Sequence, residues 1–208
     1  SEYKTTYAPV GEANLKKWRK QTTAEAISSK GYGQAVNDTN DKMLKDIQKG
    51  IRKDFAAFLA TGSGKATGVG LQAALAQVWG QLQVIWEDTS VEAVYLMNPL
   101  DVADYLGGAQ IVTQTAFGMS YIENFLGIGT VILASDVPKG KIYATASENI
   151  VLYFVNVTGS DLAQAFNLTS DTTGLIGIHT GPVYENLTSE TVAASGVGLF
   201  AENLGGVV

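Results

Sequence analysis

The stretch DKMLKDIQKGIRKDFAAFLATG, residues 41–62, decides the fold of this chain. Its large apolar residues recur every three or four positions, while Lys, Arg and Asp occupy the opposite face. This period predicts a long amphipathic helix that begins near Asn37 and ends at Gly62-Ser63-Gly64. At a rise of about 1.5 Å per residue the helix is about 33 Å long, so we expect it to run across a small domain.

The elements beyond this helix indicate an α+β fold. A second helix is predicted over Leu71–Trp86; it carries no charge, and we expect it to be covered on more than one side. A strand over Val91–Met97 turns at Asn98-Pro99 into a short helix that stops at Gly107-Gly108. The rest reads mostly as strands without regular βαβ alternation, which favours α+β. We predict strands over 130–134, 141–145, 150–157, 175–179 and 198–202, and a short helix over 160–166.

Residues 1–35 are predicted to form an extended, exposed excursion before the long helix. The pattern indicates a strand over Glu2–Tyr7, a short amphipathic turn over Glu12–Lys20 and a returning strand over Thr22–Ile27. This segment is too polar to cover its own apolar residues, so we expect it to lie on another molecule. The alternative is a flexible N-terminus. The predicted intersubunit contact residues are Tyr3, Tyr7, Lys16, Lys17, Trp18 and Lys20.

The charge distribution divides the 208 residues into two blocks. The net charge of −6 argues against a general nucleic-acid binder. Residues 1–65 nevertheless hold 12 Lys and Arg and 7 acids, a net charge of +5, whereas residues 66–208 hold 2 bases and 13 acids, a net charge of −11. Such asymmetry indicates either a basic arm for a polyanion or a basic segment that docks on the acidic body of another copy, and we favour the second.

The residue inventory excludes several classes of protein. The absence of Cys excludes disulfides and thiol nucleophiles, and the single histidine, His179, excludes sites that need two imidazoles. Residues 61–65, TGSGK, fail as a phosphate loop because Leu59 and Ala66 stand where glycine and Ser or Thr are required. We interpret His179 as a hydrogen-bonded structural residue, and we predict no cofactor, no metal site, no membrane span and no secretory signal.

Four stretches stand in a characteristic order: residues 41–62, quoted above, VYLMNPLDVADYLGG at 94–108, GIGTVILASDVPKGKIYATASENIVLYF at 127–154 and VGLFAENLGGVV at 197–208. Taken together, they resemble the major capsid proteins of tailed bacteriophages with the Hong Kong 97-type fold. The resemblance implies an extended loop over 1–30, a peripheral domain over 31–65 and 147–192 and an axial domain over 66–146 and 193–208. Because the chain opens inside the extended loop, we expect a truncated or proteolysed product, and we predict no covalent cross-link between subunits. In this resemblance, residues 41–62 correspond to the spine helix of the family.

The resemblance further implies a structural, non-enzymatic protein. Copies would form hexamers and pentamers of an icosahedral shell around a double-stranded DNA genome, without sequence-specific nucleic-acid binding. Portal, scaffold or decoration proteins are the expected partners, and the location is the virion capsid, assembled in the host cytoplasm. The alternative within the fold is an encapsulin-type compartment around cargo enzymes. Two other classes are a small α+β hydrolase or transferase that uses His179, and a surface or adhesion module.

Overall fold

The computed structural model describes residues 15–87, 91–108, 113–116, 119–155, 157, 161–171, 174–201 and 204–208. The chain divides into two compact units, one of Ser1–Val36 with Tyr153–Gly198 and one of Asn37–Leu152 with Leu199–Val208. The three domains expected over 1–30, over 31–65 with 147–192, and over 66–146 with 193–208 stay a prediction. The expected strand over Glu2–Tyr7 lies outside the described residues.

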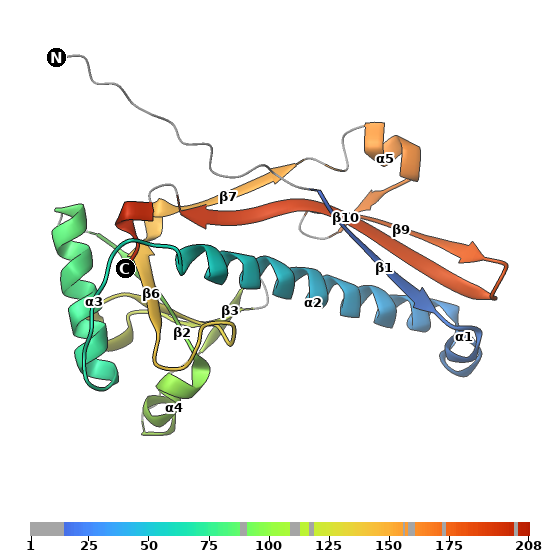
Figure 1. Ribbon diagram of the computed structural model, residues 1–208. Coiled ribbons are helices and arrows are strands. Elements are labelled where there is room, and N and C mark those ends of the chain that lie inside the picture. The colour runs from blue at the N-terminus through green and yellow to red at the C-terminus, as the bar shows by residue number, and fades with distance from the viewer. Residues whose placement is uncertain are drawn as a thin grey trace, which may run out of the picture. The chain divides into compact units, whose positions relative to one another are not determined.

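Helices and strands follow one another without a regular βαβ alternation, which confirms the α+β class (Figure 1). In chain order they are β1 (Lys16–Thr22), α1 (Ala24–Lys30), α2 (Tyr32–Leu59), α3 (Leu71–Trp86), β2 (Ala93–Met97), α4 (Pro99–Gly108), β3 (Gln114–Ala116), β4 (Met119–Ile122), β5 (Thr130–Leu133), β6 (Ile142–Ala146), β7 (Ile150–Val155), α5 (Asp161–Phe166), β8 (Thr169–Ser170), β9 (Ile176–Val183) and β10 (Thr188–Ala201), with short 3₁₀ turns at Phe125–Gly127, Ser147–Asn149 and Leu204–Gly206. None of the described helices has the length and apolar character needed to cross a membrane.

Strand β2 is the centre of the second unit, where the sheet order is β3-β4-β5-β2-β6. It pairs in parallel with β5 and antiparallel with β6. All five of its residues are buried, which accounts for the unbroken apolar run in the sequence. The Tyr95 hydroxyl donates a hydrogen bond to the Ile128 carbonyl at 3.3 Å, and burial raises the Tyr95 pKa above its ordinary value.

Each face of this sheet carries its own apolar core. Because side chains alternate along a strand, Tyr95 and Met97 enter one core, and Val94 and Leu96 enter the other. Helices α3 and α4 cover the first face; in Figure 1, α3 lies beside β6. Helix α2 covers the second face, and its contributing residues are Phe55, Ala56 and Leu59. A fully buried side chain such as Leu59 stabilises the fold by roughly 1.5–3 kcal/mol.

Helix α3 was expected to be covered on more than one side, and the described residues do not bear this out. Leu75, Val78 and Leu82 are buried against the sheet, but Val84 is 70% exposed. The helix is therefore covered on one side among the described residues. Its other positions are largely Ala and Gln, which tolerate solvent without a second covering layer.

The C-terminal residues close the edge of this sheet beside β6. Ala144 and Val208 exchange two backbone hydrogen bonds of 2.9 Å, and the Trp86 indole N–H donates to the Gly206 carbonyl at 3.2 Å. The Gly64 amide donates to the Val207 carbonyl at 2.9 Å, and a Cβ at Gly64 would overlap this segment. The glycines of residues 61–65 therefore permit close backbone packing.

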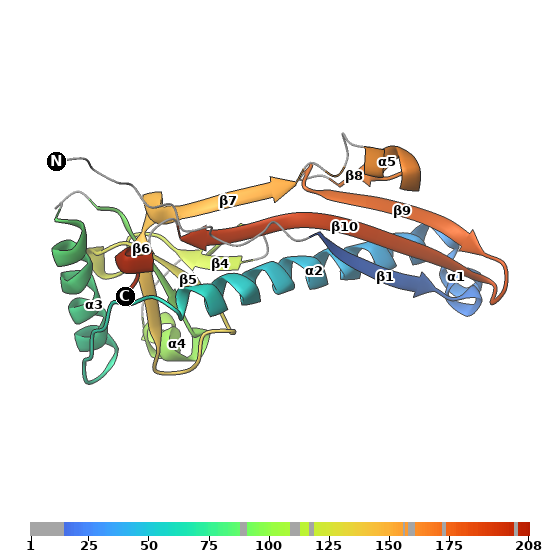
Figure 2. The ribbon, with the colours of Figure 1, turned by 45° about the horizontal axis from the view of Figure 1, so that its top comes forward.

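The first unit is built on a sheet with the order β1-β10-β9-β8, and β7 also pairs with β10. Strands β9 and β10 form a long antiparallel hairpin, which Figure 2 shows side by side. Strand β1 pairs with the other edge of β10, from Lys16 opposite Ser195 to Thr22 opposite Ser189. Segments at the two ends of the described chain thus share one sheet.

The structure corrects the local predictions for residues 12–27. Of the turn expected over Glu12–Lys20, residues 12–14 lie outside the described residues; the remainder is wrong, because Lys16–Thr22 is a strand within a sheet. The expected strand over Thr22–Ile27 is also wrong: Thr23 caps helix α1 by accepting the Ala26 amide at 3.3 Å. The pKa of the Glu25 carboxyl is lowered from its ordinary value, mainly by a backbone hydrogen bond and to a lesser extent by a hydrogen bond with the Thr23 side chain. This cap and two helix-forming alanines outweigh the weak alternation.

The long helix is confirmed, but it begins earlier than predicted. Helix α2 has 28 residues and starts at Tyr32, not near Asn37. Gly31, at φ +85°, ends α1 in a conformation that favours glycine, and α2 follows immediately. Ala35 and Val36 are buried, and that burial outweighs the local N-cap preference around Asn37, which is worth only about 1 kcal/mol.

Substitution of Gly206 tests the C-terminal closure. A Cβ at Gly206 would overlap the Trp86 ring, which is held by its own hydrogen bond, so we expect Gly206→Ala to lower the free energy of unfolding by about 1–3 kcal/mol. The control is Gly50→Ala inside α2, where a Cβ meets open space. It should raise the free energy of unfolding by about 0.5–1 kcal/mol. Urea unfolding measures both, and equal effects of the two variants would contradict the packing.

Candidate intersubunit surface

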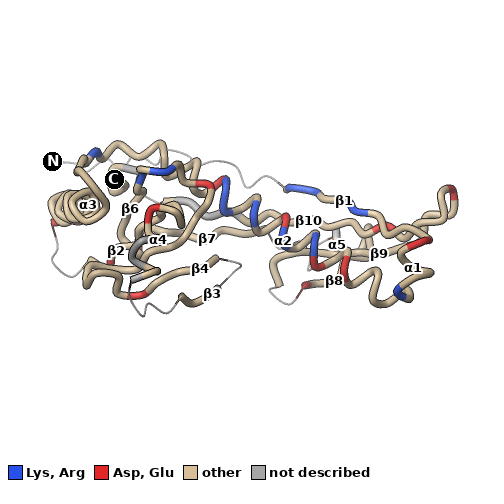
Figure 3. The backbone as a smooth tube through the Cα atoms, turned by 90° about the horizontal axis from the view of Figure 1, so that it is seen from below, with Lys and Arg blue, Asp and Glu red and all other residues tan. Residues whose placement is uncertain are grey.

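Strand β1 carries most of the predicted contact residues, and Lys and Arg mark it in the tube of Figure 3. Because successive side chains of a strand point to opposite faces, the cluster is divided. Lys17 and Arg19 share one face and are exposed. Lys16, Trp18 and Lys20 share the other, where Trp18 and Lys20 are half-buried. The structure therefore does not bring the predicted cations together on one surface.

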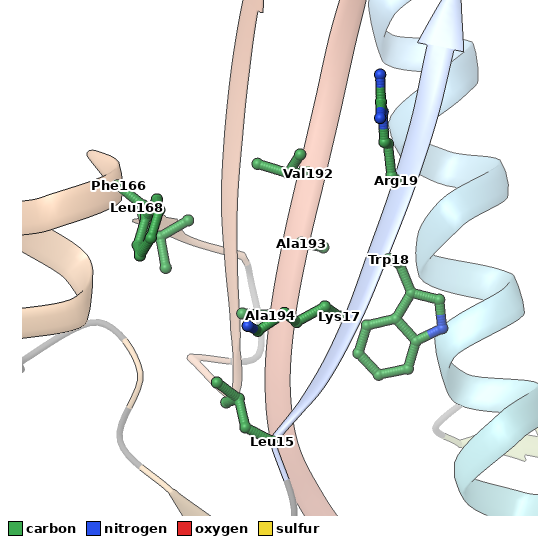
Figure 4. A pocket seen from close by; sticks show the side chains of 9 residues that line it. All are labelled: Leu15, Lys17, Trp18, Arg19, Phe166, Leu168, Val192, Ala193 and Ala194. Atoms are coloured by element: carbon green, nitrogen blue, oxygen red, sulfur yellow. The ribbon is translucent and has the colours of Figure 1, made fainter.

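A groove of about 290 Å³ lies on the first unit beside Lys17. Its walls come from the start of β1, the middle of β10 and the segment that ends α5. In Figure 4, Lys17 reaches across β10, whereas the Trp18 indole points away on the other side of β1. The lining residues are Leu15, Lys17, Trp18, Arg19, Phe166, Leu168, Val192, Ala193 and Ala194.

The groove combines an apolar lining with a cationic rim. Phe166 stays 60% exposed although it is a large aromatic residue. Opposite it, Val192 and Ala194 of β10 pair with Arg19 and Lys17 of β1 and therefore share their face. Exposed apolar surface with a polar or charged rim is typical of an interaction site.

Arg19 is the cation of this rim that has an acidic partner. Its Nε and Nη2 atoms lie 2.7 and 2.6 Å from one carboxylate oxygen of Glu190, and Gln21 Nε2 donates to that oxygen at 3.3 Å. Within the described part of the chain Lys17 has no ion pair. Among the described residues, the cation of this groove without an ion pair is thus Lys17, which belongs to the predicted contact residues.

The remaining predicted residues divide into two groups. Tyr3 and Tyr7 lie outside the described residues. His179 Nδ1 lies 3.2 Å from the Asn167 carbonyl oxygen, which can only accept, so the ring donates. Among the described residues, no three His, Asp or Glu side chains are grouped so that they could hold a metal ion.

Sequence reasoning missed the apolar half of the groove. Phe166 and Leu168 flank the end of the short helix α5, 150 positions from β1, and no local pattern joins them to that strand. One signal was available. Phe166 is a large apolar residue at the end of a six-residue helix, which is too short to cover it.

No protein-family model matches this chain, and no curated protein matches it. Solved structures do match. A virus-like particle from Pyrococcus furiosus is 13% identical with a TM-score of 0.53, over 94% of this chain and 74% of that chain. The SrpI encapsulin of Synechococcus elongatus PCC 7942 is 13% identical with a TM-score of 0.58, over 94% and 72%. A chain of Mycobacterium phage Che8 is 8% identical with a TM-score of 0.51, over 94% and 69%.

These matches establish the fold. The chain has the Hong Kong 97-type capsid fold, as the four sequence stretches had indicated. Phage capsids and encapsulins share this fold at low sequence identity.

Replacing Arg19 with Ala tests how much the rim ion pair stabilises the first unit. The Arg19 side chain is 65% exposed, so we expect the substitution to cost less than about 1 kcal/mol. Ile176→Ala, at a fully buried position of β9, is the comparison and should cost about 2–5 kcal/mol. Urea unfolding measures both. An Arg19→Ala cost as large as that of Ile176→Ala would show that the rim is structural and not available to a partner.

Proposed function

We propose that this protein is the major capsid protein of a tailed bacteriophage, and that its copies assemble into an icosahedral shell around a double-stranded DNA genome. The observation that carries the proposal is the fold, whose likeness to solved structures of shell-forming proteins extends over 94% of the chain. A phage chain is among these structures. In this proposal the protein is structural, and portal, scaffold or decoration proteins complete the virion.

The charge asymmetry supports assembly from identical copies. Residues 1–65 carry a net charge of +5 and residues 66–208 a net charge of −11, so the basic part of one copy complements the acidic part of the next. Heterologous contacts of this kind close into rings, here proposed as hexamers and pentamers. A net-negative shell also avoids high-affinity sites for the enclosed DNA, which favours dense packing of the genome.

An encapsulin-type compartment around cargo enzymes is the second candidate. The observation that favours it is the TM-score of 0.58 to the Synechococcus encapsulin. The two candidates share the fold and the shell, and they differ in the contents.

The contents of assembled particles distinguish the two candidates. We expect the complete gene product, expressed in its natural host, to form closed shells visible by electron microscopy. Purified particles should contain DNA that resists nuclease until the shell is opened. Particles that contain one co-purifying enzyme and no DNA would favour the encapsulin candidate. A product that stays monomeric at high concentration would refute both.

Charge reversal on β1 tests the predicted contact of the basic segment. We expect Lys16→Glu combined with Lys20→Glu to reduce particle yield at least severalfold, because both changes oppose docking on an acidic neighbour. Lys16 and Lys20 also interact within their own chain, so the melting temperature of the unassembled protein is measured as well, and the yield should fall at temperatures where that protein stays folded. Sedimentation and thermal unfolding measure the two effects.

The matched control is Lys42→Glu combined with Lys49→Glu, which makes the same change in net charge on the exposed face of α2. This control should assemble more efficiently than the β1 variant. Equal losses from both pairs would assign the effect to net charge. Unchanged assembly of the β1 variant would remove Lys16 and Lys20 from the contact.

A further inference from the structure

The turn between β9 and β10 presents two large apolar side chains to solvent. Tyr184 is 82% exposed and Leu187 is 71% exposed, and Glu185 between them is exposed as well. The turn has a defined shape, because the Thr188 hydroxyl donates to the Asn186 side-chain oxygen at 2.7 Å and Leu187 adopts φ +52°. An aromatic ring beside a carboxylate is thus held at the end of a paired hairpin.

The groove beside Lys17 has the complementary chemistry. It offers an apolar lining, the exposed Phe166 ring and a lysine without an ion pair among the described residues. At about 290 Å³ it is at the small end of ligand pockets, so it suits one anchoring side chain more than a long peptide. Tyr184 with Glu185 supplies such an anchor and a counter-charge for Lys17.

The turn cannot reach the groove of its own copy. β9 and β10 are paired continuously from Thr188 opposite Val183 to Ser195 opposite Ile176. Because an antiparallel strand rises about 3.4 Å per residue, Leu187 in the turn lies roughly 17 Å along the hairpin from Val192 in the groove of the same copy. A second copy is the occupant that this geometry allows.

We propose that the β9–β10 turn of one copy docks into the groove of a second copy, with Tyr184 against the apolar lining and Glu185 paired with Lys17. The inference rests on the proposed function, since it requires copies that associate. The two surfaces differ, so the contact is heterologous and propagates from copy to copy. One such contact is much smaller than a stable interface of about 1,200 Å², and its strength comes from repetition within an assembly.

Cross-linking tests the contact directly, because the chain contains no cysteine. Two variants, Leu187→Cys in the turn and Ala165→Cys beside Phe166 at the edge of the groove, are mixed and treated with a short bismaleimide; both positions are exposed, and the hydrogen bond between Thr188 and Asn186 is kept. Neither substitution removes Tyr184, Glu185 or Lys17. We expect the mixture to give covalent dimers at least severalfold above each variant alone. The control pairs Leu187→Cys with Ser29→Cys on the exposed face of α1 and should give no such excess.

A charge exchange tests the ion pair within the same assay. Lys17→Glu and Glu185→Lys, each introduced alone into both cysteine variants, should lower the yield of dimers about two- to fivefold, the size of a partly exposed ion pair. Introduced together, they should restore it. A restored yield identifies these two residues as partners, which a change in folding or in net charge would not do.

The yield of cross-linked dimers can be measured without a closed shell. A failure of the turn-to-groove contact can therefore be distinguished from a failure of the proposed capsid function. Dimers in either the particle or the soluble fraction support the docking, and their absence from both overturns it. Particles that form without this cross-link leave the proposed function intact and refute the contact. A cross-link without particles supports the contact and counts against the capsid shell.

Discussion

Burial of β2 on both faces is the constraint on which the second unit depends. A strand whose five residues all lie in the interior needs an apolar layer on each side of its sheet. Helix α2 supplies one layer through Phe55, Ala56 and Leu59, and helices α3 and α4 supply the other. The unit is therefore a three-layer arrangement, and the C-terminal residues close its edge beside β6.

The first unit has a different balance, because its sheet leaves apolar surface uncovered. Its central strand β10 buries small side chains such as Thr191, Ala193 and Ser195 on one face. Phe166 stays exposed beside the groove on the other face, and Tyr184 stays exposed at the hairpin turn. Exposed aromatic side chains next to charges mark surfaces that bind partners.

Sequence reasoning succeeded where one local pattern outweighed its neighbours. Helix α3 and the Asn98-Pro99 turn were predicted within a residue or two, because apolar spacing and proline act locally. It failed at Thr22–Ile27, where a threonine cap competes with a weak alternation. Of the residues that line the groove, the sequence prediction named Lys17 and Trp18, as contact residues of an exposed segment. It could not name Phe166, which lies near them only because strands far apart in the sequence pair.

The amino-acid sequence alone determined the α+β class, the long amphipathic helix and the charge asymmetry, because composition and apolar period are properties of the chain itself. Only the tertiary structure decided that β1 joins β10 and that its cations fall on two faces. Strand pairing places side chains on one face or the other in register with a distant partner, and no local pattern contains that register.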